Sequence, residues 1–317
     1  GLIEVGAETG EVSNVIIHNG EFLNNRGSAY SAGGVYAKYC STITVNNGKF
    51  VGNTSNGTAD NGTDGGSVFT LSSGATITIN GGEFTSNTGY YGVLRATTSN
   101  TLVDKKQERT ISILGGTFKN NTASGNGGTI NIDARNSVAS GSITNVEIKN
   151  ITIDNSFSSN NGGAIFVKAN NVKLSNVSVL NSQALGVAGA GYFEAINGIT
   201  LIENCEINNN QASKFAGAFY FEECANVSIT SSNFNNNIGF ATKVEEETFA
   251  SVGAIYFLGT TNKNFNNLNL NITDCLIQNN NGKAGVANDG EEILLGAGAV
   301  GVFAGANVKI ENSNVLA

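Results

Sequence analysis

Apolar and polar residues alternate with a period of two along much of the chain. Thr42-Ile-Thr-Val45 and Asn171-Val-Lys-Leu174 show the pattern, in which every second residue is apolar. Successive side chains of a β-strand point to opposite faces of a sheet, so this period predicts short strands with one buried face. No segment combines a period of 3.6 residues with helix caps, and we therefore expect no helices.

The strands belong to a repeat whose anchor is an apolar residue followed by two small or polar residues and then Asn or Ser. Most anchors have a second apolar residue seven positions earlier; Ile199 is displaced from this spacing by one residue. The spacing between copies varies, as expected for coils with loops of different length. The copies begin at Phe22, Phe50, Phe84, Phe118, Ile153, Val179, Ile207, Phe234 and Ile277, and a tenth begins at Val315.

The other half of each repeat is Gly-Gly or Gly-Ala followed by an apolar run, as in Gly162-Gly-Ala-Ile165 and Gly253-Ala-Ile-Tyr256. Strands this short must stack on the next copy to bury their apolar face. The sequence therefore predicts an all-β fold, a single-stranded parallel β-helix of about ten coils, stacked about 4.8 Å apart. We expect it to be right-handed, because parallel crossovers have that preference.

Asparagine recurs at the end of each anchor motif. We expect its side chain to line a turn or the interior, where stacked amides bond to the coils above and below, and Asn also tolerates the left-handed conformation of tight turns. The predicted structural ladder comprises Asn25, Asn53, Asn87, Asn121, Asn210, Asn237 and Asn280.

Composition agrees with a chain made almost entirely of central strands. The 317 residues include 41 Gly and no Pro, and proline is excluded from central strands because it donates no ladder hydrogen bond. The net charge is −8, which argues against binding of nucleic acid or anionic membranes. No apolar run is long enough to span a membrane. We expect one β-helix domain over residues 1–317, as a segment of a longer extracellular chain.

The alternation of FxxN copies, such as Phe50 to Asn53, with GGA[ILV]-like copies, such as Gly162 to Ile165, resembles the passenger domains of chlamydial polymorphic membrane proteins. Similar β-helical surface proteins occur in some protists. The resemblance spans nearly the whole chain and implies a secreted or surface-displayed β-helix that acts in adhesion. We expect no C-terminal membrane barrel of the kind found in that family, and several of the GGA copies in this chain are degraded.

Many β-helices are polysaccharide lyases or hydrolases, which need clustered carboxylates and basic groups. The acidic groups here, such as Asp60/Asp64 and Glu245 to Glu247, lie mostly in inserted loops, where charged runs are usually solvated. The only histidine, His18, is expected on a solvated strand. We predict no catalytic, cofactor-binding or metal-binding residues and no cofactor; a carbohydrate-active enzyme is the alternative.

Long loops on a rigid scaffold are common binding sites. Four segments lengthen their coils, and Arg95, Lys105, Lys106 and Arg109 form a small basic group near the first of them. We expect any cell-surface or matrix partner to bind there, although such loops also absorb insertions at little cost. The four segments are residues 97–109, 240–248, 259–267 and 283–292.

Threonine pairs recur on three successive coils: Thr42/Thr44, Thr76/Thr78 and Thr110/Ser112. Regular outward hydroxyl ranks are typical of ice-binding faces, which makes ice binding a second alternative. Threonine is also simply favoured on exposed strands. The series ends at the next coil, where the corresponding residues are Asn145 and Glu147.

Cysteines and N-glycosylation sequons are the remaining residues with candidate chemical roles. Cys40, Cys205, Cys224 and Cys275 do not fall at matching places in neighbouring repeats, and we expect free, buried thiols. Among the Asn-x-Ser/Thr sequons, Asn56 and Asn61 lie in a polar, Gly-rich loop and are the predicted glycan acceptors.

These observations predict a non-enzymatic extracellular rod with a structural or adhesive role. Both ends of the sequence lie within the repeat pattern, and open β-helix ends expose ladder edges that favour association. We therefore expect partners to be copies or neighbouring segments bound end to end, and loops to bind surface or matrix partners.

Overall fold

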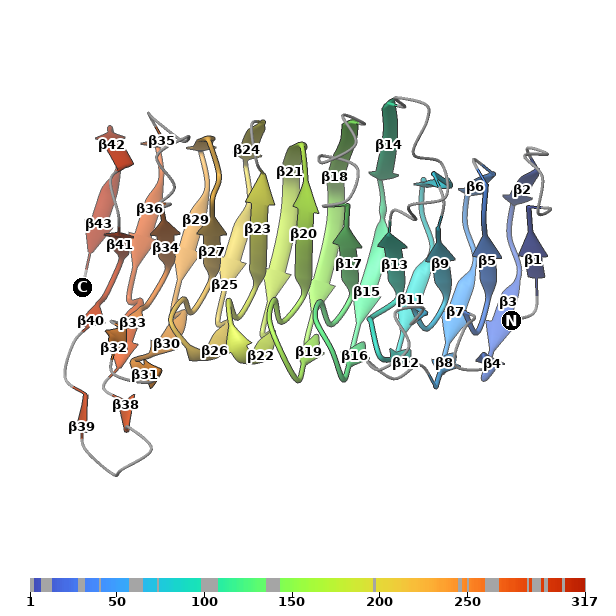
Figure 1. Cartoon of the computed structure of the whole chain (residues 1–317), viewed down its shortest axis with the longest axis horizontal. Helices are drawn as coiled ribbons and strands as arrows, with labels where there is room; N and C mark the ends of the chain where they lie inside the picture. Colours follow the sequence, from blue (N-terminus) through green and yellow to red (C-terminus); the bar gives the residue numbers. More distant parts are fainter. Residues whose placement is uncertain are drawn as a thin grey trace.

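The chain folds into a parallel β-helix, as predicted, and the computed structural model contains no helix among the residues that it describes. Successive coils stack along one axis, with N- and C-terminal coils at opposite ends of a rod (Figure 1). The described residues are 3–6, 13–27, 32–39, 41–56, 65–72, 74–97, 108–134, 143–195, 198–244, 247–249, 251–259, 268–283, 285–286, 292–293, 296–303 and 306–316.

Three parallel sheets run the length of the rod, and each coil contributes to all three except where a strand is missing at an end. Sheet A follows the Gly-Gly half of each repeat and has ten strands, which agrees with the predicted number of coils. Its strands are β1 (Ile3–Val5), β5 (Val35–Ala37), β9 (Phe69–Leu71), β13 (Leu94–Thr97), β17 (Ile130–Asp133), β20 (Ile165–Ala169), β23 (Gly191–Ala195), β27 (Phe219–Glu222), β34 (Ile255–Leu258) and β41 (Val300–Phe303).

Sheet B contains the alternating strands and forms two columns separated by a bend. The first column comprises β2 (Asn14–Ile17), β6 (Thr42–Val45), β10 (Thr76–Ile79), β14 (Glu108–Ile113), β18 (Ile143–Asp154), β21 (Asn171–Leu180), β24 (Ile199–Glu203), β28 (Asn226–Thr230), β35 (Leu268–Thr273) and β42 (Ala306–Glu311). The second comprises β3 (Glu21–Leu23), β7 (Lys49–Val51), β11 (Glu83–Thr85), β15 (Gly116–Lys119), the ends of β18 and β21, β25 (Glu206–Asn208), β29 (Asn233–Asn235), β36 (Leu276–Gln278) and β43 (Asn314–Leu316).

Sheet C is formed by the short strands that follow the asparagines. They are β4 (Arg26–Gly27), β8 (Thr54–Ser55), β12 (Thr88–Gly89), β16 (Thr122–Ala123), β19 (Phe157–Ser158), β22 (Gln183–Val187), β26 (Gln211–Lys214), β30 (Ile238–Phe240) and β37 (Asn281–Lys283). A short parallel pair, β33 (Ser251–Val252) and β40 (Gly296–Ala297), adjoins it.

Two antiparallel hairpins depart from the coil pattern near the C-terminal end. They are β31 (Thr242–Val244) with β32 (Glu247–Phe249), and β38 (Gly285–Val286) with β39 (Glu292–Ile293). Both fall in segments that the sequence marks as long loops, and Figure 1 shows β38 and β39 projecting from the corner of the rod.

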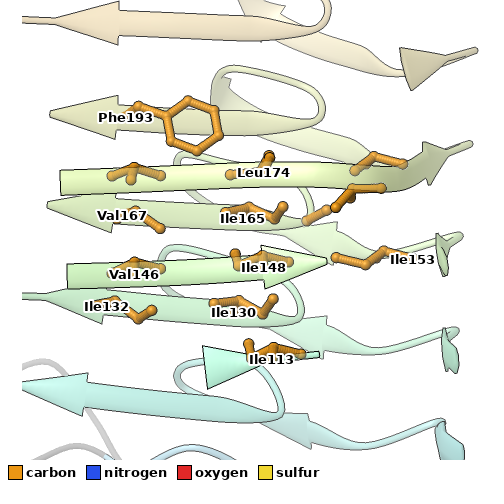
Figure 2. Packing of buried hydrophobic residues seen from close by; sticks show 14 of the residues in the cluster. Ile113, Ile130, Ile132, Val146, Ile148, Ile153, Ile165, Val167, Leu174 and Phe193 are labelled. Carbon is orange, nitrogen blue, oxygen red and sulfur yellow. The ribbon is translucent and has the colours of Figure 1, made fainter. Parts of the chain in front are cut away.

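The interior is filled by the anchor residues together with the inward apolar residues of sheet A and of the first column of sheet B, and many of them stack on their equivalents in the next coil. Figure 2 shows aliphatic side chains such as Ile132, Val146 and Val167 pointing into the space between the sheets. The rings of Phe22, Phe50, Phe84 and Phe118 stack in one file, with centroids 4.6 to 4.8 Å apart. Stacked aromatic pairs contribute about 0.5–1.5 kcal/mol beyond their burial.

One predicted core residue faces outward. Ile199 is 50% exposed, and Thr200 occupies the buried register position between Val172 and Val227. The strand therefore keeps the register of its neighbours in spite of the one-residue offset of Ile199. As a result, the polar residue Thr200 occupies a core position. A shift of one residue would have turned the whole strand inside out.

The last two residues of each anchor motif, most often asparagines, have different roles. The first lies in the left-handed region, as Asn24, Asn120 and Asn209 do with φ of 54°, 56° and 59°. The second turns inward. Asn87 Nδ2 donates to the carbonyl of Phe50 in the previous coil at 2.8 Å and to Asn121 Oδ1 in the next at 3.1 Å.

The inward asparagines form two hydrogen-bonded runs. The backbone N–H and Nδ2 of Asn25, Asn53 and Asn87 each donate to Oδ1 of the next asparagine, ending at Asn121. Asn210, Asn237 and Asn280 repeat the arrangement, and Ser156 and Ser182 occupy the two coils between the runs. All seven predicted ladder asparagines therefore lie in this single file.

The Gly-Gly motif is explained by close approach of the backbone. A Cβ atom on Gly163 would lie 2.0 Å from the carbonyl oxygen of Gly189, and one on Gly189 would lie 2.2 Å from that of Gly217. Contacts this short are impossible, so glycine is needed at the same point of successive coils.

Replacing a ladder asparagine should destabilise the fold far more than replacing an exposed one. In Asn87→Ala the buried carbonyl of Phe50 and the N–H of Asn53 lose their partners, and each buried unsatisfied group costs about 1–3 kcal/mol. We expect a loss of about 2–5 kcal/mol in the free energy of unfolding, measured by denaturant titration. Asn80→Ala removes an exposed bond to Asn46 and should cost less than about 0.5 kcal/mol; equal losses would contradict the ladder's importance.

Candidate functional site

The outer face of sheet B carries a shallow groove of about 450 Å³ across β14, β18, β21 and β24. The coil register places its walls in two files. One file contains Thr110, Asn145, Asn171 and Ile199, and the other contains Glu147, Lys173 and Leu201. Ligand sites are commonly concave and of this size, so the groove is the leading candidate for a binding surface.

Asn145, Asn171 and Lys173 of the groove are already paired with one another or with neighbouring carboxylates. Asn171 Nδ2 donates to Asn145 Oδ1 at 2.8 Å, and Asn145 Nδ2 donates to Glu108 at 2.9 Å. Lys173 forms an ion pair with Glu203 at 3.3 Å, and both side chains are partly exposed. Exposed pairs of this kind are weak, about 0–1 kcal/mol, so a ligand can exchange partners with them at little cost. Ile199 and Leu201 add an aliphatic surface.

A second set of side chains lies on the outer face of sheet A. Phe166, Tyr192, Tyr220, Tyr256 and Phe303 stack in a file, with ring centroids 4.4 to 5.4 Å apart. All except Phe303 are buried, because residues of the preceding turns, such as Phe215 and Val252, pack against them. The file is a second hydrophobic cluster outside the coil interior.

Charged residues flank this aromatic file. Lys168 and Glu194 form a buried ion pair, the ammonium of Lys168 lies 5.2 Å from the ring centroid of Tyr192, and the hydroxyl of Tyr192 donates to Glu222. Burial, followed by the charge of Glu222, raises the pKa of Tyr192 and Tyr220, and burial raises the pKa of Tyr256 to about 12. These phenols therefore stay protonated at neutral pH. Their burial fits a packing role.

The predicted basic group does not form one exposed patch. Arg109 is buried, and its guanidinium donates to Thr144 Oγ1 at 3.1 Å and to the carbonyl of Ala75. Arg95 lies over the ring of Tyr91 at 4.0 Å and donates to Asn131. Lys105 and Lys106 lie outside the described residues. Sequence reasoning missed the burial of Arg109 because an arginine beside a long loop usually faces solvent.

The threonine pairs stand in register on the first column of sheet B. Thr42 lies beside Thr76 and Thr44 beside Thr78, with Ser112 next to Thr78. Their side chains are half-buried except that of Thr110, which is exposed, and Thr42 Oγ1 donates to Asn14 Oδ1 at 2.5 Å. The file is bounded by Ile16 on one side and Glu147 on the other.

The glycan-acceptor candidates fall in different surroundings. Asn56 is exposed at the end of β8, and its Oδ1 accepts hydrogen bonds from the Arg26 guanidinium. Asn61 lies outside the described residues. Asn53 also heads a sequon, yet it is 0% exposed within the ladder.

The remaining candidate residues are dispersed. His18 is exposed beside Asn46. Of the acidic candidates, Asp60, Asp64, Glu245 and Glu246 lie outside the described residues. Within the described ranges, no three His, Cys, Asp or Glu side chains gather closely enough to hold a metal ion. The same part of the chain contains no helix of the length and apolarity needed to cross a membrane.

Three cysteines, Cys205, Cys224 and Cys275, are free and buried, and Cys40 lies outside the described residues. Burial raises the pKa of Cys205 to about 11, that of Cys224 to about 12, and also that of Cys275. Nucleophilic thiols have lowered pKa values, so these residues are packing groups.

Comparison with known proteins gives no relative. No model of a known protein family matches the chain, and neither a curated protein nor a solved structure matches it significantly. The resemblance to chlamydial passenger domains therefore stays a prediction from the repeat motifs.

The buried thiols should resist alkylation in the native protein. Only the thiolate attacks iodoacetamide, so at about pH 8 we expect Cys205 and Cys224 to react at least about a hundredfold more slowly than in the unfolded chain. Because their folded pKa lies above the ordinary value of 9.0, their contribution to stability is full below pH 9 and is lost as pH rises toward 11 and 12. Labelling followed by peptide mass spectrometry measures the rates; equal native and unfolded rates would contradict the packing.

Proposed function

We propose that this chain is a non-enzymatic structural or adhesive β-helix of the extracellular space, a rigid rod that presents contact surfaces along its sides. The main support for the proposal is that the residues conserved from one repeat to the next within this chain make contacts between successive coils. Asn, Phe and Gly at these positions hold one coil to the next through the ladder, the ring stack and the close backbone approach. Ten such coils give a rod on the order of 45 Å long.

The last described coil supports end-to-end association. Val308, Ile310 and Val315 occupy core-facing register positions and are 41%, 45% and 46% exposed, whereas their partners in the preceding coil are fully buried. An open rung also presents unpaired strand edges. A further coil, from a neighbouring segment or another copy, would bury these side chains in the way that Leu270 and Ile272 are buried.

The sides of the rod support the adhesive part of the proposal. The groove on sheet B offers an aliphatic surface at Ile199 and Leu201 beside the exchangeable ion pair of Lys173 and Glu203. The hairpin β38–β39 projects from the same rigid scaffold (Figure 1). Function placed on projections of a rigid frame is a common arrangement.

Electron microscopy of the purified protein tests the rod. We expect straight rods that associate end to end. Ile310→Lys should abolish this association, because a charge at a core position opposes burial. Thr230→Lys, at an outward position of β28, is the matched control and should leave it unchanged. Single rods without end contacts in all three proteins would contradict the association. Release of oligosaccharides from acidic polysaccharides by the pure protein would contradict the non-enzymatic part.

The register of the threonine pairs favours one second candidate, ice binding. Thr42, Thr44, Thr76 and Thr78 form a regular array on one face. If the array orders water, the protein will show thermal hysteresis that Thr76→Lys reduces severalfold. Absence of hysteresis in the unmodified protein would exclude this candidate and leave the structural role.

A further inference from the structure

Several sequons have an exposed asparagine on sheet B or at its edges, and one, Asn56, follows strand β8 of sheet C. In a eukaryotic secreted protein, Asn-x-Ser/Thr accepts an oligosaccharide on the side-chain nitrogen. Exposure alone does not distinguish these residues in an Asn-rich chain, but the hydrogen bonds that they make do. The exposed sequon asparagines to be compared are Asn56, Asn120, Asn150, Asn176, Asn226 and Asn271.

The outer asparagines form hydrogen bonds between coils in which the later coil donates through Nδ2 and the earlier coil accepts through Oδ1. Nδ2 of Asn155 donates to Oδ1 of Asn120 at 2.8 Å, and Nδ2 of Asn269 donates to Oδ1 of Asn226 at 2.9 Å. The sequon residue is the acceptor in each pair, so its own Nδ2 is not used in the ladder. A glycosylamide keeps its carbonyl oxygen, and attachment of a sugar therefore leaves these bonds intact.

Asn150 and Asn176 form one such pair, and both head sequons, so one is the acceptor and the other is the donor. Nδ2 of Asn176 donates to Oδ1 of Asn150 at 3.1 Å. Asn150 is thus an acceptor with its nitrogen toward solvent, whereas the nitrogen of Asn176 lies against the neighbouring coil. A glycan on Asn150 preserves the pair, and one on Asn176 would crowd it.

Asn53 also heads a sequon, but the fold leaves no place for a glycan on its side chain. Its Nδ2 donates to the Phe22 carbonyl at 2.8 Å and to Asn87 Oδ1 at 3.0 Å, so both hydrogens are used, and the side chain is fully buried. A sugar would remove one of these buried bonds and would have no space.

Asn56 and Asn271 are the remaining exposed sequon asparagines. Asn56 uses Oδ1 to accept from Arg26. Asn271 is exposed on β35, in register with Ser228 and Lys309 of the adjoining coils.

We propose that Asn56, Asn120, Asn150, Asn226 and Asn271 are N-glycosylation sites and that Asn53 is unmodified in the folded protein. This inference rests on the proposed extracellular location. The donor is a lipid-linked oligosaccharide pyrophosphate. The bond formed joins Nδ2 to the sugar C1, the C1–O bond to the pyrophosphate breaks, and the lipid pyrophosphate leaves while Nδ2 loses one proton. The resulting glycans at Asn120, Asn150, Asn226 and Asn271 would lie along sheet B and its edges, and the one at Asn56 would lie beside sheet C.

The test is secretion of the chain from a eukaryotic cell line, followed by peptide mapping after enzymatic deglycosylation in heavy-oxygen water. Each occupied Asn is converted to labelled Asp. We expect label at the five sites and none at Asn53. Thr122→Ala, Thr152→Ala and Ser228→Ala each destroy one sequon without changing its asparagine. Each should remove one glycan mass and leave the melting temperature unchanged.

Secreted, folded protein labelled at Asn53, or bare at all five sites, would overturn the proposal. Electron microscopy of the same material separates this result from the proposed function. Bare rods would overturn only the glycosylation, whereas glycosylated molecules that are not rods would overturn the structural role.

Discussion

The buried asparagine amide is the interaction on which the rest of the structure depends. A carboxamide has two N–H donors and an oxygen with two lone pairs, and the side chains of Asn53, Asn87 and Asn237 use all of them. Asn87, for example, is bonded to the previous coil through Phe50 and Asn53 and to the next through Asn121. Since an unpaired buried amide is costly, each coil is stable only with its neighbours in place, which ties the asparagine file to the extended rod.

Packing inside the rod follows from the distance between successive coils. Stacking coils about 4.8 Å apart brings equivalent side chains into contact, so a planar ring at one anchor favours a ring at the next, as in Phe50 and Phe84. The same spacing leaves no space for a Cβ at Gly163. Outer faces are free of these constraints and differ along the rod: sheet A carries Thr70 and Asn131 in its N-terminal half and Tyr192 and Tyr256 at equivalent places later.

Much of the fold was predictable because the repeat has period-2 strands with fixed anchors. Phe50, Phe84 and their equivalents are buried as expected, and the double asparagine separates into a left-handed residue and an inward one. The aromatic file on sheet A was missed. Phe166, Tyr192 and Tyr220 occupy outward positions of their strands. Only an alignment of the Gly-Gly halves of successive repeats would have shown that these residues occupy the same position in each coil.

The groove and the burial of Arg109 were not predictable, for a different reason. Both depend on how side chains from three or four coils meet, and variable loop lengths obscure that register in the sequence. The residues of the groove, such as Thr110 and Leu201, are separated by up to two intervening repeats. Periodicity indicates which face a residue occupies, but contacts across coils follow only once the register is known.

Residue-resolved hydrogen exchange tests the central claim most directly. The backbone N–H of Asn87 bonds to Asn121 Oδ1, so in Asn121→Ala its protection should fall sharply. The N–H of Asn210, bonded to Asn237 in the separate second run, should keep its protection and shows that the fold persists. Unchanged protection at Asn87 in that variant would contradict the claim that the side-chain ladder holds the coils together.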